Sequence, residues 1–340
     1  MLRVLSSKRI EWIDFAKGVG VYLVAVGHLW YACPLPIVNK VIYSFHMPMF
    51  FMLSGYVTRW KDVAPKDYVL GKVLRLLVPA VLFILMGVPF YLHFSHDMTL
   101  KELVKRIIFW NGLCPFNAPA WYFIVLFEVS VFNQLLRLSK LPISAKSIAA
   151  AAFFVLGWLV FSSPIQLHFG FDRAIVALGF HLIGQAVGDA SRIVSIEETT
   201  KRRLLRAFLP IAALLCAAIG GICNGKVSFY AFDLQDYWLF IAAGLVGSLA
   251  FFAGSFLIWE RLPRVRAWAE PTILFVGTHY LIVQPLVILM NRVGFSGGLA
   301  SLVIALLLPL ALLEAYKAFF PVIDRRLPAL TGSLTWRKSR

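Results

Sequence analysis

The sequence predicts an all-α integral membrane protein with about ten transmembrane helices, and three observations carry this prediction. Of the 340 residues, 60% are hydrophobic and 15% are charged, whereas a soluble domain has about 45–50% apolar and about 25% charged residues. Apolar runs that approach the roughly 20 residues needed to cross a bilayer recur along the chain. Short basic segments separate these runs. The composition therefore excludes a soluble enzyme.

The apolar runs and basic breaks predict where the membrane spans lie. The expected spans are 10–32, 39–58, 73–94, 118–136, 144–162, 172–190, 204–223, 237–259, 270–290 and 299–320. Residues 99–110 (TLKELVKRIIFW) are too short to span and are apolar on one side, so we expect an interfacial helix there. We expect one domain over 1–340, with a basic tail at 322–340. The first span is too long, and too interrupted by Asp14 and Lys17, to be a cleavable signal peptide.

The distribution of basic residues predicts the orientation. With the N-terminus inside, 26 of the 33 Lys and Arg residues fall in segments on the cytoplasmic side. This bias follows the positive-inside rule, so we expect both termini in the cytoplasm. The net charge of +16 is spread over short inter-span segments, which argues against nucleic-acid binding. The four cysteines form no close-spaced pair with histidines, which argues against a zinc site. Cys33 and Cys114 could both face the outer side, but burial is the expected role.

Polar and ionisable side chains, which are energetically unfavourable inside a membrane span, concentrate in the hairpin expected at about 10–58. Asp14, Lys17 and His28 fall in its first helix and His46 in its second; such intramembrane groups indicate function. With the turn centred near Ile37, His28 and His46 are each nine residues from it and should lie at one depth. Lys17 and His28 are eleven residues apart, about three helical turns or roughly 16 Å. A basic site on one side and an imidazole site on the other would suit group transfer between the two sides.

Two stretches of this hairpin carry a family resemblance. The run IDFAKGVGVYLVAVGH, followed by FHMPMFFMLSGYV, resembles the opening of the membrane-bound acyltransferase 3 family, whose members, including fucose 4-O-acetylase-like proteins, O-acylate sugars. That family's basic residue, ten residues and histidine match Lys17 to His28, although Arg is more usual at the first position. The run from Lys72 to Pro79 resembles its third helix, and Thr278-His279-Tyr280 resembles a late histidine motif.

The resemblance implies roles for these residues. His28 would be the catalytic base or acyl relay, and His46 would orient it or bind the acceptor. Imidazole titrates near pH 6.5 and so can take a proton from a hydroxyl. Lys17, Arg59, Lys72 and Arg75 would hold the phosphates of an acyl-CoA that arrives from the cytoplasm. We expect this donor to be acetyl-CoA. The acceptor would be a sugar hydroxyl of a surface or exported glycan, in a bacterial inner membrane and without a metal.

Further polar residues in the spans are candidates for substrate binding. The candidates are Asp14, which can pair with Lys17, and Trp121, Glu128 and His279. Each also has a structural interpretation, since Trp121 suits an aromatic belt at the membrane edge and Lys17 could extend to the interface. We interpret His181 as structural. Three other functions stay open: transfer of a succinyl group, acylation of a small sugar, amine or peptide instead of a polymer, and a transporter or exporter of glycans or acyl groups. Clustering of polar residues in the first hairpin alone argues against transport.

Overall fold

The computed structural model describes residues 10–29, 36–94, 99–109, 117–164, 167–194, 197–295 and 298–334, and within these ranges most residues are helical. Cys33, Cys114, Trp110 and the end of the basic tail lie outside the described residues. The long helices are α1 (Glu11–Leu29), α2 (Pro36–Val57), α4 (Val78–Phe94), α6 (Trp121–Leu135), α7 (Ile143–Phe161), α8 (Phe171–Ile193), α9 (Glu198–Cys216), α10 (Tyr237–Ile258), α11 (Thr272–Arg292) and α12 (Leu299–Arg326). Shorter helices are α3 (Pro65–Lys72), α5 (Leu100–Phe109) and α13 (Pro328–Thr331).

The all-α prediction is confirmed, and the chain is a multi-pass integral membrane protein. Eight helical segments of the described chain are long and apolar enough to cross a bilayer; the total of ten spans stays a prediction. The other two expected spans correspond to α1 and α2, of 19 and 22 residues. Several helices are longer than the expected spans. Helix α3 continues through a π-helical stretch, η2 (Val73–Leu77), into α4, and α12 extends to Arg326. These differences arise because polar residues beyond the apolar run can continue a helix, whereas the expected spans were limited to the apolar residues.

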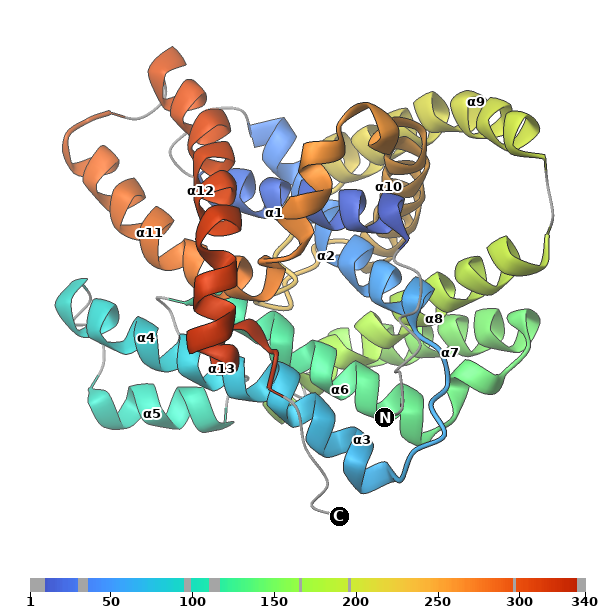
Figure 1. Ribbon diagram of the computed structural model, residues 1–340, viewed down its shortest axis with the longest axis horizontal. Helices are drawn as coiled ribbons and strands as arrows, with labels where there is room; N and C mark the ends of the chain where they lie inside the picture. Colours follow the sequence, from blue (N-terminus) through green and yellow to red (C-terminus); the bar gives the residue numbers. More distant parts are fainter. Residues whose placement is uncertain are drawn as a thin grey trace.

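The first hairpin, α1 and α2, lies in the middle of the molecule (Figure 1). Helix α1 packs against α2, α11 and η8 (Pro263–Ala269). Its glycines set the register with α2, because a Cβ on Gly27 would lie 3.0 Å from the Tyr43 ring and one on Gly20 would lie 2.8 Å from Met49 Cε. His28 is therefore level with a position about one turn before His46. The difference from the expected register arises because α2 begins at Pro36, earlier than the expected residue 39.

Helix α8 holds α2 in place through very close backbone contact. A Cβ on Gly55 would overlap the carbonyl of His181, and one on Gly184 would overlap the carbonyl of Met52. Small residues permit such close approach between membrane helices. The position of α2, which carries His46, is consequently set by glycines on both helices.

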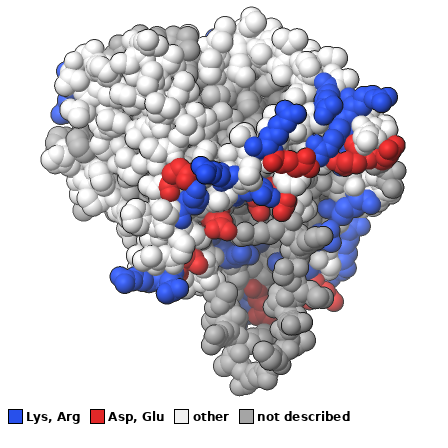
Figure 2. All heavy atoms as spheres, turned by 45° about the horizontal axis from the view of Figure 1, so that its top comes forward, with Lys and Arg blue, Asp and Glu red and all other residues white. Residues whose placement is uncertain are grey.

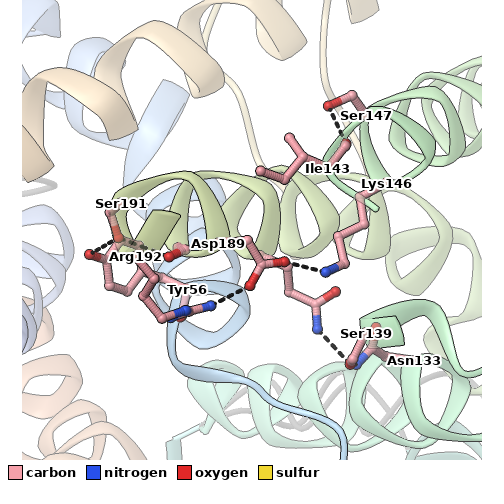
Figure 3. A network of polar contacts seen from close by, with 11 residues as sticks. Tyr56, Asn133, Ser139, Ile143, Lys146, Ser147, Asp189, Ser191 and Arg192 are labelled. Carbon is pink, nitrogen blue, oxygen red and sulfur yellow. Dashed lines mark hydrogen bonds and ion pairs between the residues drawn. The ribbon is translucent and has the colours of Figure 1, made fainter. Parts of the chain in front are cut away.

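A polar network joins the ends of α2, α7 and α8 (Figure 3). Asp189 accepts from both Lys146, which is 3% exposed, and Arg192. Tyr56 and Ser191 share a hydrogen bond of 2.8 Å. Nearby, the Ser139 hydroxyl accepts from the amides of Gln185 and Asn133, each at 2.8 Å. The network fixes these helix ends relative to one another.

On the face drawn in Figure 2, charged side chains are gathered on one part of the surface. Charged groups occupy only part of the face in Figure 2, and uncharged residues cover much of the rest. Large apolar side chains are exposed on the outer helices, such as Leu159 on α7, Leu214 on α9 and Leu307 on α12. Lipid-facing surfaces require such side chains. Helix α5, in the segment expected to be interfacial, begins with a capping box between Thr99 and Glu102.

Candidate active site

A cavity of about 440 Å³ lies where α1, α2 and α11 meet. The remaining walls come from the start of α6, from η3 (Ala118–Ala120) before it, and from the loop that precedes α10. The described residues that line it are Val24, His28, Tyr43, His46, Met47, Phe50, Ala118, Pro119, Trp121, Tyr122, Ser228, Phe229, Tyr230, Thr272, Val276, Tyr280, Gln284, Val287, Ile288 and Asn291. Both histidines of the first hairpin therefore reach one cavity.

His279 of α11 joins this pair from behind His28. The centroids of the His28 and His279 rings are 5.3 Å apart, and the Tyr280 ring lies 4.9 Å from that of His28. His279 is fully buried and does not line the cavity. Its ring stacks on Phe275 at an interplanar angle of 2°. His28 thus stands between the cavity and a second imidazole.

Backbone carbonyls select the tautomers of His46 and His279. His46 Nδ1 lies 2.8 Å from the carbonyl oxygen of Ile42, and His279 Nδ1 lies 2.9 Å from that of Phe275. A carbonyl only accepts, so each Nδ1 carries the hydrogen and donates it, which leaves Nε2 as a base. His279 Nε2 is buried without a hydrogen-bond partner among the described residues. Each of the two rings therefore keeps one unprotonated nitrogen available.

Helix α11 presents one continuous stripe to the cavity. The stripe consists of Thr272, Val276, Tyr280, Gln284, Val287, Ile288 and Asn291, which recur every three or four residues. Such spacing places side chains on one helix face. Thr272 and Asn291 are nineteen residues apart, which corresponds to about 28 Å at 1.5 Å per residue. This length approaches the roughly 30 Å of the hydrocarbon core, so the stripe runs across much of the membrane.

Aromatic side chains from α2, α6 and the loop before α10 form another part of the cavity wall. Trp121, which is 5% exposed, packs against Phe229 at 5.6 Å between ring centroids, and Tyr122 packs against Phe50 at 5.8 Å. Arg173, paired with Asp172, donates from Nε to the carbonyl of Tyr230 at 2.7 Å. This contact anchors the loop before α10. The aromatic wall could stack on a sugar ring.

Asn117 ties the start of the α6 segment to α11. Its side-chain amide donates to the carbonyls of Phe83 and Gly277 at 2.7 and 2.8 Å. Asn117 is fully buried, and Gly277 lies two residues before His279. The amide thereby links the η3 part of the cavity wall to the helix that carries His279.

The predicted cations lie on separate elements. Lys17 pairs with Asp14 at 3.9 Å on α1, three turns before His28 and beside η8. Lys72, at the end of α3, donates to the Ser130 hydroxyl at 3.1 Å and lies 5.6 Å from the Tyr68 ring centroid.

The two remaining predicted cations are both exposed. Arg59 follows α2. Arg75 lies in η2, where Gly332 packs on its backbone carbonyl. The structure places Lys17 on the helix that leads to the cavity, and it places Lys72 and Arg75 on a different helix.

Glu128 lies away from the cavity wall. It is 6% exposed and sits beside Gly170, with Asp172 and Arg173 as its charged neighbours. Its Oε2 has no hydrogen-bond partner among the described residues. The structure thus groups Glu128 with the pair that anchors the loop before α10, and it groups Trp121 with His28 and His46.

Several lining residues escaped the sequence reasoning. Tyr43, Gln284 and Asn291 all reach the cavity, as does Tyr280, which the sequence singled out only as part of the motif Thr278-His279-Tyr280. The spacing on α11 could have indicated that these residues share one helix face, since Tyr280 and Gln284 follow Val276 at intervals of four. No group of three or more described His, Cys, Asp or Glu residues could hold a metal ion.

Comparison with known proteins gives two findings that bear on this site. Residues 10–316 match the sequence model of a family described as an acyltransferase domain. The chain is also 31% identical to nodulation protein NolL of Mesorhizobium japonicum over 156 residues, which are 41% of this chain and 40% of that protein. The match thus spans less than half of that relative's length. No solved structure matches the chain.

Proposed function

Because the chain belongs to this acyltransferase family, we propose that it moves an acyl group from an acyl-CoA to a sugar hydroxyl of a surface or exported glycan. The observation that carries the proposal is the meeting of His28 and His46 at one cavity, with His279 behind His28. A hydroxyl is a poor nucleophile until a base takes its proton. Imidazole is the side chain best suited to that task near neutral pH.

The reaction balances with one imidazole and no further reagent. The acceptor hydroxyl gives its proton to an imidazole nitrogen while its oxygen attacks the thioester carbonyl. The C–O bond forms, the C–S bond breaks, and the departing thiolate takes the proton from the imidazolium to give free CoA. An alternative route forms an acyl-imidazole at His28 first, which the acceptor then attacks. Tyr280 and Tyr43 also line the cavity, where a hydroxyl donor would suit the oxyanion that either route develops.

We place the protein in a bacterial inner membrane, with the donor entering from the cytoplasm. The position of Lys17, near the expected cytoplasmic end of α1, suits this direction of entry. Lys17 lies on α1 three turns before His28. Among the α11 residues that line the cavity, Thr272 is nearest in sequence to η8, and η8 also contacts α1. A donor whose phosphates meet Lys17 could extend its thioester arm along the α11 stripe. Lys72, Arg75 and Arg59 supply further positive charge for a polyanionic donor.

Cells carrying defined variants test the proposal. Ester-linked acyl groups on the surface glycan would be measured by NMR in cells that lack the gene or express wild type, His28→Ala or His93→Ala. His93 is an exposed histidine of α4 and serves as the control, with membrane levels matched by immunoblot. We expect the ester signals to be lost in the null strain and in His28→Ala, and to persist in His93→Ala.

Unchanged esters in every strain would contradict the proposal. In that case a transport function would be tested by uptake and export assays on the same strains. Full acylation by a correctly inserted His28→Ala protein would remove the catalytic role of the imidazole.

A further inference from the structure

The cavity is lined by uncharged groups around its imidazoles. Its described lining side chains are aliphatic, aromatic, hydroxyl, amide, thioether or imidazole groups, and none is a carboxylate, an ammonium or a guanidinium. Arg173, which bonds the backbone of the lining residue Tyr230, does not itself line the cavity and is already paired with Asp172.

A charged reactant would lose its hydration here without gaining a partner. Burial of a carboxylate without a partner is strongly unfavourable. His28 or His46 could pair with it only as an imidazolium. Neutral His46 offers a carboxylate no N–H, because its Nδ1 already donates to the carbonyl of Ile42. Protonation of His28 would remove the lone pair that the proposed chemistry needs, so that ring cannot both hold a substrate carboxylate and act as the base.

We propose that this cavity accepts only uncharged reacting groups, so that the transferred acyl group is an uncharged one, such as acetyl, and not a dicarboxylic acyl group such as succinyl. The inference rests on the proposed function. It extends to the acceptor, because the amides of Gln284 and Asn291 suit hydroxyl groups and the aromatic wall suits an uncharged sugar ring. A sugar that carries a free amine or carboxylate at the reacting unit is excluded by the same reasoning.

A comparison of acyl donors, each supplied separately, tests the inference directly. Membrane vesicles from host cells with and without the gene would receive acetyl-, butyryl- or succinyl-CoA with a labelled acyl group. Alkali-labile label on the membrane glycan would be the readout. Butyryl is the control for size, because it has the four carbons of succinyl without its second carboxylate. We expect a kcat/KM for succinyl-CoA at least about 100-fold below that for butyryl-CoA.

The outcomes separate the inference from the function on which it rests. Similar use of succinyl- and butyryl-CoA would overturn the inference and leave the acyltransferase function in place. Equal rejection of butyryl and succinyl would also overturn it, because size and not charge would then set the choice. Absence of labelled product from every donor, with the protein present in the vesicles, would overturn the proposed function itself.

A single introduced charge gives a second test. Gln284 lies one turn from Tyr280 on the cavity stripe, so Gln284→Arg would supply a partner for a substrate carboxylate. We expect the ratio of succinyl to butyryl transfer to rise at least about tenfold, equivalent to one favourable charge contact. Leu289→Arg is the matched control, since Leu289 is on the same helix, is 57% exposed and does not line the cavity. An equal rise in both variants, or no rise in Gln284→Arg, would count against the inference.

Discussion

The imidazoles of His28 and His279 lie 5.3 Å apart across the contact between α1 and α11. They are 251 residues apart in the sequence, and His28 alone of the two lines the cavity. The carbonyls of Phe275 and Val276, on the same helix, orient the ring of His279 through its Nδ1. Its Nε2 has no hydrogen-bond partner among the described residues. We therefore propose that His279 acts as a positioning residue for His28, the proposed base, through this ring contact.

Substitution of His279 therefore affects catalysis more than binding. We expect His279→Ala to lower kcat about 100-fold, a typical contribution of acid–base positioning, with little change in the KM for acyl-CoA. His279→Gln keeps a polar group near the same place and should retain more activity than His279→Ala. Steady-state kinetics on membranes with matched protein levels would check both. A change confined to KM, or equal losses in the two variants, would speak against a positioning role.

Lys17 should contribute to donor affinity. Lys17→Ala is expected to raise the KM for acyl-CoA about tenfold, as loss of one charge-assisted phosphate contact would, while kcat changes little. Lys17→Arg keeps the charge and should stay near wild type. Lys40→Ala, at the opposite end of the hairpin, is the control. The prediction fails if Lys17→Ala and Lys40→Ala have the same donor KM.

The glycines between α2 and α8 should be intolerant of a methyl group. A Cβ on Gly55 or Gly184 would overlap backbone carbonyls, which cannot move as side chains do. We expect Gly55→Ala and Gly184→Ala each to destabilise by about 3 kcal/mol. Gly71→Ala meets no atom within 4 Å and should be neutral or slightly stabilising in a helix. Thermal unfolding in detergent would measure the difference, and similar melting temperatures in all three variants would contradict it.

The two partners of Asp189 predict an asymmetry in stability. Asp189→Asn leaves the buried ammonium of Lys146 unpaired, which costs about 3 kcal/mol when a buried pair loses one member. Lys146→Met removes the buried charge and leaves Asp189 paired with Arg192. We therefore expect Asp189→Asn to lower the melting temperature more than Lys146→Met. The reverse order would show that the network of Figure 3 does not stabilise these helix ends as described.

The helices could be predicted from the sequence because a bilayer imposes a simple rule of length and polarity. Each expected span corresponds to a long helix, and errors occur where a helix continues past the apolar run, as at Pro65 and Arg326. The register of the first hairpin could not be predicted as closely, because it depends on the residue at which α2 begins.

The site was only partly predictable, because pairing between distant helices depends on packing. The polarity of His28 and His46 within apolar spans identified them, and Trp121 was named from its position at a helix end. The contact of His279 with His28 depends on how α11 packs against α1, which no local pattern specifies. The same holds for Glu128, which the structure groups with Asp172 and Arg173 instead.

Release of free CoA tests the central claim most directly. The thiol formed from acetyl-CoA would be followed in membranes that contain equal amounts of wild type, His28→Ala or His93→Ala. We predict a rate at least about 100-fold lower in His28→Ala, with His93→Ala unchanged. A His28→Ala protein that releases CoA at the wild-type rate would contradict the assignment of His28 as the group that performs the transfer.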